Sequence, residues 1–286
     1  MKNISRRKFL SQSAMGAGTF LLAMQMPELL RAANSNQMPI GFQTFPIRDI
    51  LAKDFAGTLK MMAGQGYKLT EMCSPKGYEN IGYGPLVGMK ASEMKKVIND
   101  SGLTCPSCHF GFGELSPDKI DEKIAWSQEL GLTQMICSTF WLPKTATLND
   151  YYAAADKLNV AADKIKKAGI QTGFHNHDME FAKLDGQLIY DALLNRFDAN
   201  LVKLQFQTEV INNGYKAADY FKKYPGRFIS SHLSDWTPEK KEIAVGKGVI
   251  DWKEFFAAAK DTGVKNYFVE MNLDKFKDSA DYIHSM

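Results

Sequence analysis

The sequence predicts an α/β protein with the (β/α)₈ barrel fold in a single domain. Short β-prone runs alternate with amphipathic stretches along the whole chain after residue 33. Eight such pairs in about 250 residues match the usual size of this fold. A doubly wound sheet would carry a glycine-rich phosphate loop after its first strand. Here that strand leads into Phe45-Pro46-Ile47-Arg48, so the barrel is favoured.

The expected elements follow one another without a linker between them. We expect strands at 39–45, 67–73, 103–109, 133–138, 170–177, 201–207, 227–233 and 266–272. Helical periodicity fills the gaps at about 49–65, 90–101, 116–130, 150–168, 186–195, 216–223 and 250–262, with a last helix at 274–284. Glycines 66, 102, 131, 169 and 263 each lie between a helix and the next strand, where a helix-ending glycine belongs. Ser116-Pro117-Asp118 and Thr147-Leu148-Asn149-Asp150 are typical of helix starts.

Residues 1–33 have the pattern of a twin-arginine (Tat) signal peptide. Ser5-Arg6-Arg7-Lys8-Phe9-Leu10 precedes an apolar stretch from 14 to 24 and a small-residue end at Ala32-Ala33. That stretch is shorter than the ~20 residues that span a bilayer. We therefore expect export to the periplasm with removal of 1–33, no stable membrane anchor afterwards, and a barrel domain over 34–286.

The basic character of the chain belongs mostly to this leader. Residues 1–33 contain five basic residues and one acidic residue, while the whole chain has a net charge of +3. The remainder therefore has a net charge near −1. Without a basic surface stripe, nucleic acid is not an expected partner.

The four cysteines raise the question of disulfides in an oxidising compartment. Cys105 and Cys108 form a Cys-x-x-Cys pattern, but on a strand the residues i and i+3 face opposite ways. We therefore expect all four thiols to be small core residues.

Polar residues gather at the ends of the expected strands. Four of the five histidines lie there, and His175 and His177 share one face because side chains alternate along a strand. The full set is Gln43, Glu71, His109, His175, His177, Gln205, Gln207, His232, Asp235, Glu270 and Asn272. Because barrel active sites lie at the carboxyl ends of the strands, these side chains predict one site.

The mature chain resembles the xylose-isomerase-like TIM barrels known as sugar phosphate isomerases/epimerases, a group that includes endonuclease IV. The resemblance rests on four segments in the right order, together with the signal peptide. They are Gly-Phe-His-Asn-His-Asp-Met-Glu-Phe (173–181), Gly-Arg-Phe (226–228) leading to His-Leu-Ser-Asp (232–235), Gly-Lys-Gly-Val-Ile-Asp-Trp (246–252) and Gly-Val-Lys-Asn-Tyr-Phe-Val-Glu (263–270).

The resemblance implies a divalent metal site formed by four strands. The family takes Glu, Asp, His and Glu from strands 5 to 8, and the matching positions here are His175, Gln207, His232 and Glu270. This set carries one negative charge where the family's carries three. Nitrogen-rich ligation favours Zn²⁺, Mn²⁺ or Fe²⁺ over Mg²⁺. Alternatively, the site has lost its metal and remains as a polar sugar pocket.

The resemblance also implies proton abstraction beside a sugar carbonyl. In the family two glutamates serve as acid and base, and His175 stands in place of one of them. We expect one-sided abstraction, with an imidazole of near-neutral pKa as the base. His177 is the candidate, and its alternative roles are to support the metal ligands or to donate to a sugar hydroxyl. An exported enzyme suggests a neutral sugar or glycoside as substrate. Elimination from a glycoside oxidised at C3 fits at least as well as isomerisation or epimerisation.

Two further functions are weighed against this enzyme. A non-catalytic sugar-binding protein on a degraded site is the alternative. A nuclease like endonuclease IV would need more metal ligands and a basic surface, and the net charge opposes it. Oligomers are possible, and the sequence does not specify them.

Several candidates carry two interpretations. His109 is either catalytic or a satisfied core histidine. Glu71 is either catalytic or in a salt bridge to Lys68 or Arg48. Asp235 contacts substrate or caps the loop after strand 7. Phe140 and Trp141 form a sugar-stacking platform or a plug in the barrel mouth.

The remaining candidates have simpler expectations. Gln43 and Gln205 are expected to bind substrate. Glu180 either orients an imidazole or is solvated. Trp252 and Phe255, three residues apart, are expected to pack a helix onto the barrel.

Overall fold

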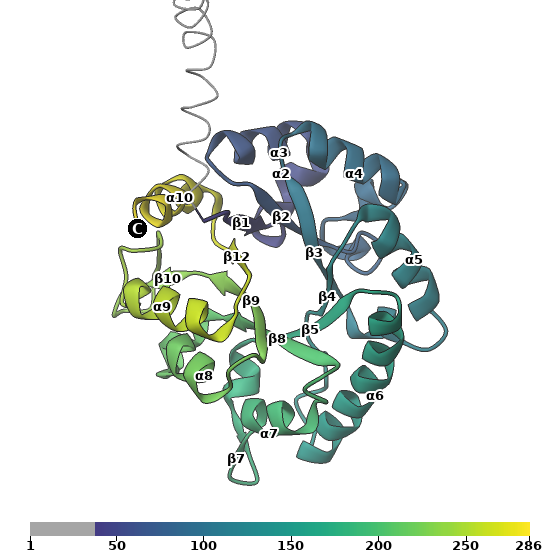
Figure 1. The fold of residues 1–286 in the computed structure, drawn as a ribbon, viewed down its shortest axis with the longest axis vertical. Helices are drawn as coiled ribbons and strands as arrows, with labels where there is room; N and C mark the ends of the chain where they lie inside the picture. Colours follow the sequence, from purple (N-terminus) through teal and green to yellow (C-terminus); the bar gives the residue numbers. More distant parts are fainter. Residues whose placement is uncertain (1–37) are drawn as a thin grey trace, which may run out of the picture. The chain divides into compact units, whose positions relative to one another are not determined.

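The computed structural model describes residues 38–286, and the predicted signal peptide at 1–33 lies outside them. Within these residues eight parallel strands close a barrel in the order β1-β12-β9-β8-β5-β4-β3-β2 (Figure 1). The strands are β1 (Gly41–Gln43), β2 (Leu69–Cys73), β3 (Thr104–Phe110), β4 (Gln134–Cys137), β5 (Gln171–His175), β8 (Val202–Gln207), β9 (Phe228–Leu233) and β12 (Asn266–Val269). The predicted single-domain (β/α)₈ barrel is confirmed.

Helices surround the strands, as Figure 1 shows. They are α2 (Arg48–Lys53), α3 (Phe55–Gly64), α4 (Ala91–Asp100), α5 (Ile120–Leu130), α6 (Leu148–Lys167), α7 (Ile189–Arg196), α8 (Ala217–Lys223), α9 (Trp252–Thr262) and α10 (Phe276–Ser285). Among these residues no helix is long and apolar enough to cross a membrane.

Local signals explain where several helices begin and end. The helix expected at 49–65 is two helices, because Asp54 has a non-helical backbone and its carboxylate accepts a hydrogen bond from the Gly57 N–H, capping α3. Thr147 and Asp150 cap α6 reciprocally, as predicted. Gly131 and Gly263 end α5 and α9 with φ of 92° and 89°. By contrast, α5 begins at Ile120 and not near Ser116.

Two short hairpins were not predicted. One pairs β6 (Lys183–Leu184) with β7 (Gln187–Leu188) through an Asp-Gly turn, and the other pairs β10 (Asp235–Trp236) with β11 (Glu242–Ile243). Two-residue strands leave too few positions for an alternating pattern.

Aromatic rings fill the layer between the barrel and its helices. Trp252 and Phe255 are buried with ring centroids 5.1 Å apart, which confirms their predicted packing. All four cysteines are free and buried, as expected. In contrast to this aromatic layer, polar side chains line the inside of the barrel at the carboxyl ends of the strands.

Candidate active site

Glu71 is the centre of a buried hydrogen-bond network inside the barrel. The strand register places it between Gln43 on β1 and Ser107 on β3. Its carboxylate accepts hydrogen bonds from Gln43 Nε2 (2.7 Å) and from Ser107 Oγ. Gln205 Nε2 (2.8 Å) and His232 Nε2 donate from the other half of the barrel. Every neighbour is a donor, so the position requires a group that only accepts.

The predicted salt bridge from Glu71 to Lys68 or Arg48 is wrong, because its ionic partners are imidazoles. His232 bonds it directly, and His109 Nε2 lies 3.3 Å away. Burial alone raises the pKa of Glu71, but interactions with His109 and His232 outweigh burial and hold the pKa well below its ordinary value. Glu71 is therefore an anionic anchor with no exposed surface.

His232 lies between two carboxylates. Its Nδ1–H donates to Glu270 Oε2 at 2.8 Å, while its Nε2–H donates to Glu71. Burial alone lowers the pKa of His232, but Glu270 and Glu71 outweigh it and raise the pKa to about 10. With a proton on each nitrogen, His232 is an imidazolium that joins Glu71 on β2 to Glu270, the residue after β12.

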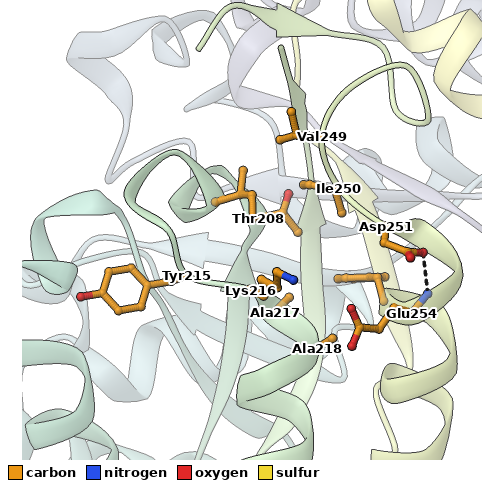
Figure 2. A pocket seen from close by; sticks show the side chains of 11 residues that line it. Thr208, Tyr215, Lys216, Ala217, Ala218, Val249, Ile250, Asp251 and Glu254 are labelled. Carbon is orange, nitrogen blue, oxygen red and sulfur yellow. Dashed lines mark hydrogen bonds between the residues drawn. The ribbon is translucent and has the colours of Figure 1, made fainter. Parts of the chain in front are cut away.

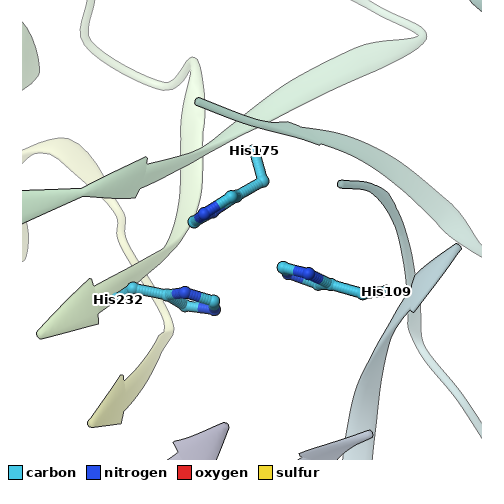
Figure 3. A group of neighbouring side chains, drawn as sticks. All are labelled: His109, His175 and His232. Atoms are coloured by element: carbon cyan, nitrogen blue, oxygen red, sulfur yellow. The ribbon is translucent and has the colours of Figure 1, made fainter. Parts of the chain in front are cut away.

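Three histidines converge on one another from different strands, as Figure 3 shows. They are His109 on β3, His175 on β5 and His232 on β9, and each offers a nitrogen within 4.8 Å of the others'. The rings of His109 and His232 stack with centroids 5.1 Å apart, and His175 lies 4.3 Å from His232. This buried triad could hold a metal ion.

The chemistry of the triad fits a cation. Burial, together with the neighbouring His232, lowers the pKa of His175 well below its ordinary value, so its ring is the neutral form that binds metals. Its buried Nδ1 has no hydrogen-bond partner within residues 38–286. A bound cation would also neutralise Glu71 and Glu270 in place of the proton on His232.

The candidate ligand set differs from the one that the resemblance implied. His175 and His232 belong to both sets, but His109 takes the place of Gln207 and Glu270. The amide nitrogen of Gln207 donates to Glu270, and that carboxylate also holds His232. Gln207 and Glu270 thus support the triad from one side in this structure.

His177 lies just past the end of β5, beside the triad. Its ring centroid is 4.8 Å from that of His175. Burial lowers the pKa of His177 to about 4, although Glu270 acts to raise it. The expectation of a near-neutral pKa is therefore wrong, because its surroundings remove water and include further imidazoles. His177 is a neutral imidazole over the physiological range.

Glu180 is buried with 1% of its surface exposed, so its solvated interpretation is wrong. It bonds the backbone of His177 and not an imidazole: the His177 N–H donates to Glu180 Oε2 at 2.7 Å. The buried Thr139 side chain acts to lower the pKa of the same carboxyl group. Burial raises the pKa of Glu180 to about 7, with the His177 N–H opposing it. A buried carboxyl group thus holds the backbone of the loop after β5.

We expect Glu180→Gln to stabilise the protein above about pH 4.5, with the full effect reached just above pH 7. The folded pKa of about 7 lies above the ordinary 4.5, so ionisation costs folding free energy. The wild type keeps its full stability below about pH 4.5 and loses part of it as the pH rises through 7. Glutamine keeps an acceptor for His177 and does not ionise. Urea unfolding should show similar stability at pH 4.5 and a variant more stable by roughly 3 kcal/mol at pH 8. An equal difference at both pH values would contradict the raised pKa.

Gln43 and Gln205, which were expected to bind substrate, face inward. Gln205 accepts from His109 Nε2 at 2.7 Å and donates to Glu71 and Ser230. Gln43 donates to Glu71 and accepts from Thr44 and the Phe45 N–H. Their polar atoms are used within the protein, so these amides hold Glu71 and His109 in place.

Asp235 has the loop-capping role that was its other interpretation. Its buried carboxylate accepts from the backbone N–H groups of Trp236, Gly246, Gly248 and Ile250 and from Trp252 Nε1, at distances of 2.8 to 3.3 Å. These five donors occupy the carboxylate and leave no acceptor site for a substrate. The expected contact between Asp235 and the substrate is therefore corrected to this loop-capping role. The carboxylate fixes the loop between β9 and α9.

Two serines complete the network and were missed by the sequence analysis. Ser107 bonds Glu71, and Ser230 accepts from Gln205. Strand alternation could have found Ser107, since it shares a face with His109.

A small cavity of about 70 Å³ lies away from this network, between the loop after β8 and the start of α9, where the Asp251 carboxylate accepts from the Glu254 N–H (Figure 2). Its lining contains no histidine.

The family model of the xylose isomerase-like TIM barrel matches residues 59–285. The chain belongs to this family. The xylose isomerase-like barrel is also similar to two sugar phosphate isomerases/epimerases of known structure from Parabacteroides distasonis. One has a TM-score of 0.71 and 25% identity, with 86% of this chain and 97% of that chain covered. The other has a TM-score of 0.72 and 23% identity, with coverage of 87% and 94%.

A more distant relative of this xylose isomerase-like barrel is an L-ribulose 3-epimerase, at 15% identity and a TM-score of 0.62, covering 86% of this chain and 93% of that one. That likeness shows the fold alone. No curated protein matches the chain.

Proposed function

We propose that this xylose isomerase-like barrel abstracts a proton beside the carbonyl of a neutral sugar or glycoside. The reaction is isomerisation or epimerisation, or elimination of the C1 substituent from a glycoside oxidised at C3. The observation that supports it is the pairing of a neutral imidazole, His177, with a buried polar cluster at the carboxyl ends of the strands. A periplasmic location, as the leader suggests, fits a substrate without phosphate.

His177 is the proposed base. It is neutral at physiological pH, and its buried Nδ1 has no hydrogen-bond partner within the described residues. A base with a pKa of about 4 is weak, so the neighbouring C–H has to be acidified. Glu270, with 18% of its side chain exposed, is the carboxylate of the network that reaches solvent, and His109 is 7% exposed.

In the elimination, His177 takes the C2 proton and the freed electron pair forms the C1–C2 double bond. The bond from C1 to its substituent breaks, and the departing oxygen receives a proton. Elimination needs one base and one acid, whereas epimerisation needs proton transfer at two faces.

We further propose that His109, His175 and His232 hold a divalent metal ion. Imidazole ligands favour Zn²⁺, Mn²⁺ or Fe²⁺ over Mg²⁺. Such an ion would polarise the substrate carbonyl and acidify the C–H beside it.

Metal content is expected to be about one ion per chain in the exported protein, by elemental mass spectrometry. His175→Ala should lose most of it, because it removes the ligand whose Nδ1 is unpartnered. His284→Ala, outside the site on α10, is the matched control and should retain the ion. A metal-free wild type after reconstitution with Zn²⁺, Mn²⁺ or Fe²⁺ would overturn the metal site.

Activity is tested in D₂O with keto sugars and 3-keto glycosides. We expect deuterium at the carbon beside the carbonyl, or release of the C1 substituent, detected by mass spectrometry. Glycoside binding without either reaction in metal-loaded protein would favour a non-catalytic sugar-binding protein.

A further inference from the structure

Trp141 has a backbone conformation that bulky residues rarely adopt. Three non-glycine residues of the described chain have positive φ: Trp141 (51°), Asp185 (50°) and Lys240 (60°). Asp185 precedes Gly186 in the two-residue β6–β7 turn, where this conformation is normal. Lys240 lies in the turn that Thr237 closes in the β10–β11 hairpin. Trp141 belongs to no hairpin, so its strained backbone calls for another reason.

The neighbours of Trp141 hold this conformation in place. Phe140 is buried and packs against Phe112 and Phe174, with ring centroids 4.8 Å from each. The Trp141 N–H donates to the buried Thr139 Oγ1 at 3.4 Å. Trp141, in contrast, is 66% exposed. The backbone thus directs one ring into the core and the next one into solvent.

Buried side chains also relate Trp141 to the proposed base. Thr139, which accepts from the Trp141 N–H, lies close enough to Glu180 to act to lower the pKa of that carboxyl group, and Glu180 accepts from the His177 N–H. Thr139 and Glu180 are both buried, one beside each loop. Both loops follow neighbouring strands, β4 and β5, at the end of the barrel where substrates bind.

We propose that Trp141 is a stacking platform for a ring with an apolar face, carried by the substrate outside the reacting sugar. This inference rests on the proposed function and names its substrate class. The reacting sugar has to reach the buried polar cluster. The exposed indole can therefore contact only the part of the substrate that extends outward from that sugar. A free monosaccharide has no such part. The substrate is therefore a glycoside whose C1 substituent is an aryl group or a second pyranose, both of which stack on indole.

Calorimetric binding of unreactive glucosides tests the platform. The ligands are the α and β anomers of methyl and phenyl glucoside, with maltose and cellobiose. In Trp141→Gly we expect roughly 3- to 10-fold weaker binding of ligands that carry a second ring, and unchanged binding of the methyl glucosides. Weakening with phenyl glucosides alone assigns an aryl group, and weakening with disaccharides alone assigns a second sugar.

Glycine also relieves the backbone strain, so the thermal midpoint of Trp141→Gly should not fall. Asp185→Gly makes the same change in the exposed turn of the β6–β7 hairpin, outside the polar cluster, and should bind every ligand like the wild type. Equal weakening for all ligands, or none for any, would overturn the platform alone. Failure of the wild type to bind any of these or the matching galactosides and xylosides would overturn the proposed carbohydrate function as well.

Discussion

His177→Ala is expected to lower kcat by 10²- to 10⁴-fold on whichever keto sugar proves to be a substrate, the usual contribution of a positioned base. The thermal midpoint should change little. The Nδ1 atom of His177 has no hydrogen-bond partner within residues 38–286, so removing the ring leaves no donor stranded there. Steady-state kinetics, with loss of deuterium from the carbon beside the carbonyl, measures the effect.

Two comparisons separate a base from a structural residue. Partial recovery of kcat on adding free imidazole would indicate that the missing group is the base itself. His284→Ala removes the fifth histidine, on α10, and should leave kcat unchanged. An undiminished exchange rate in His177→Ala would assign proton abstraction to another group, with His109 and Glu270 next in line.

Glu71→Gln is expected to lower the free energy of unfolding by roughly 3–5 kcal/mol, although the two side chains have nearly the same shape. Four donors converge on the Glu71 carboxylate. The NH₂ group of glutamine is itself a donor, so it would face buried donors that have no other acceptor within reach. His232 would also lose one of the two carboxylates that stabilise its charge. Urea unfolding at pH 7 measures the loss.

Glu122→Gln is the matched control, since it makes the same substitution at an exposed carboxylate that pairs with Lys76. Exposed ion pairs contribute little, so its unfolding midpoint should stay near that of the wild type. A Glu71→Gln variant as stable as this control would show that the network tolerates a donor at its centre.

The barrel was predictable because its signals are local. The succession of β-prone runs and amphipathic stretches gave eight strands in the right places, and residues such as Gly131 and Gly263 marked where helices end. Strand alternation also explains why His109 and His232 could be placed at the barrel mouth. Such signals depend on a few neighbouring residues.

The roles of individual side chains depend on register across the barrel, which a single sequence does not show. Gln205 was expected to face substrate, but its strand pairing sets it beside Ser230 and within reach of Glu71, 134 residues away. His109 entered the triad for the same reason. Asp235 was ambiguous because the loop that its carboxylate organises lies later in the sequence. Phe140 and Trp141 were treated as one pair, but Phe140 is buried against Phe112 and Phe174 while Trp141 is exposed.

The pairing of β1 with β12 has a consequence for how this chain reaches its final state. These two strands lie near opposite ends of the described sequence, and their ladder joins Gly41 to Phe268. The ring of strands cannot be completed until β12, at residues 266–269, has been synthesised. Contacts of such high sequence separation form slowly, and an unfinished chain presents the open edges of β1 and β9 to other molecules. The period between synthesis and closure is therefore when aggregation competes most strongly with folding.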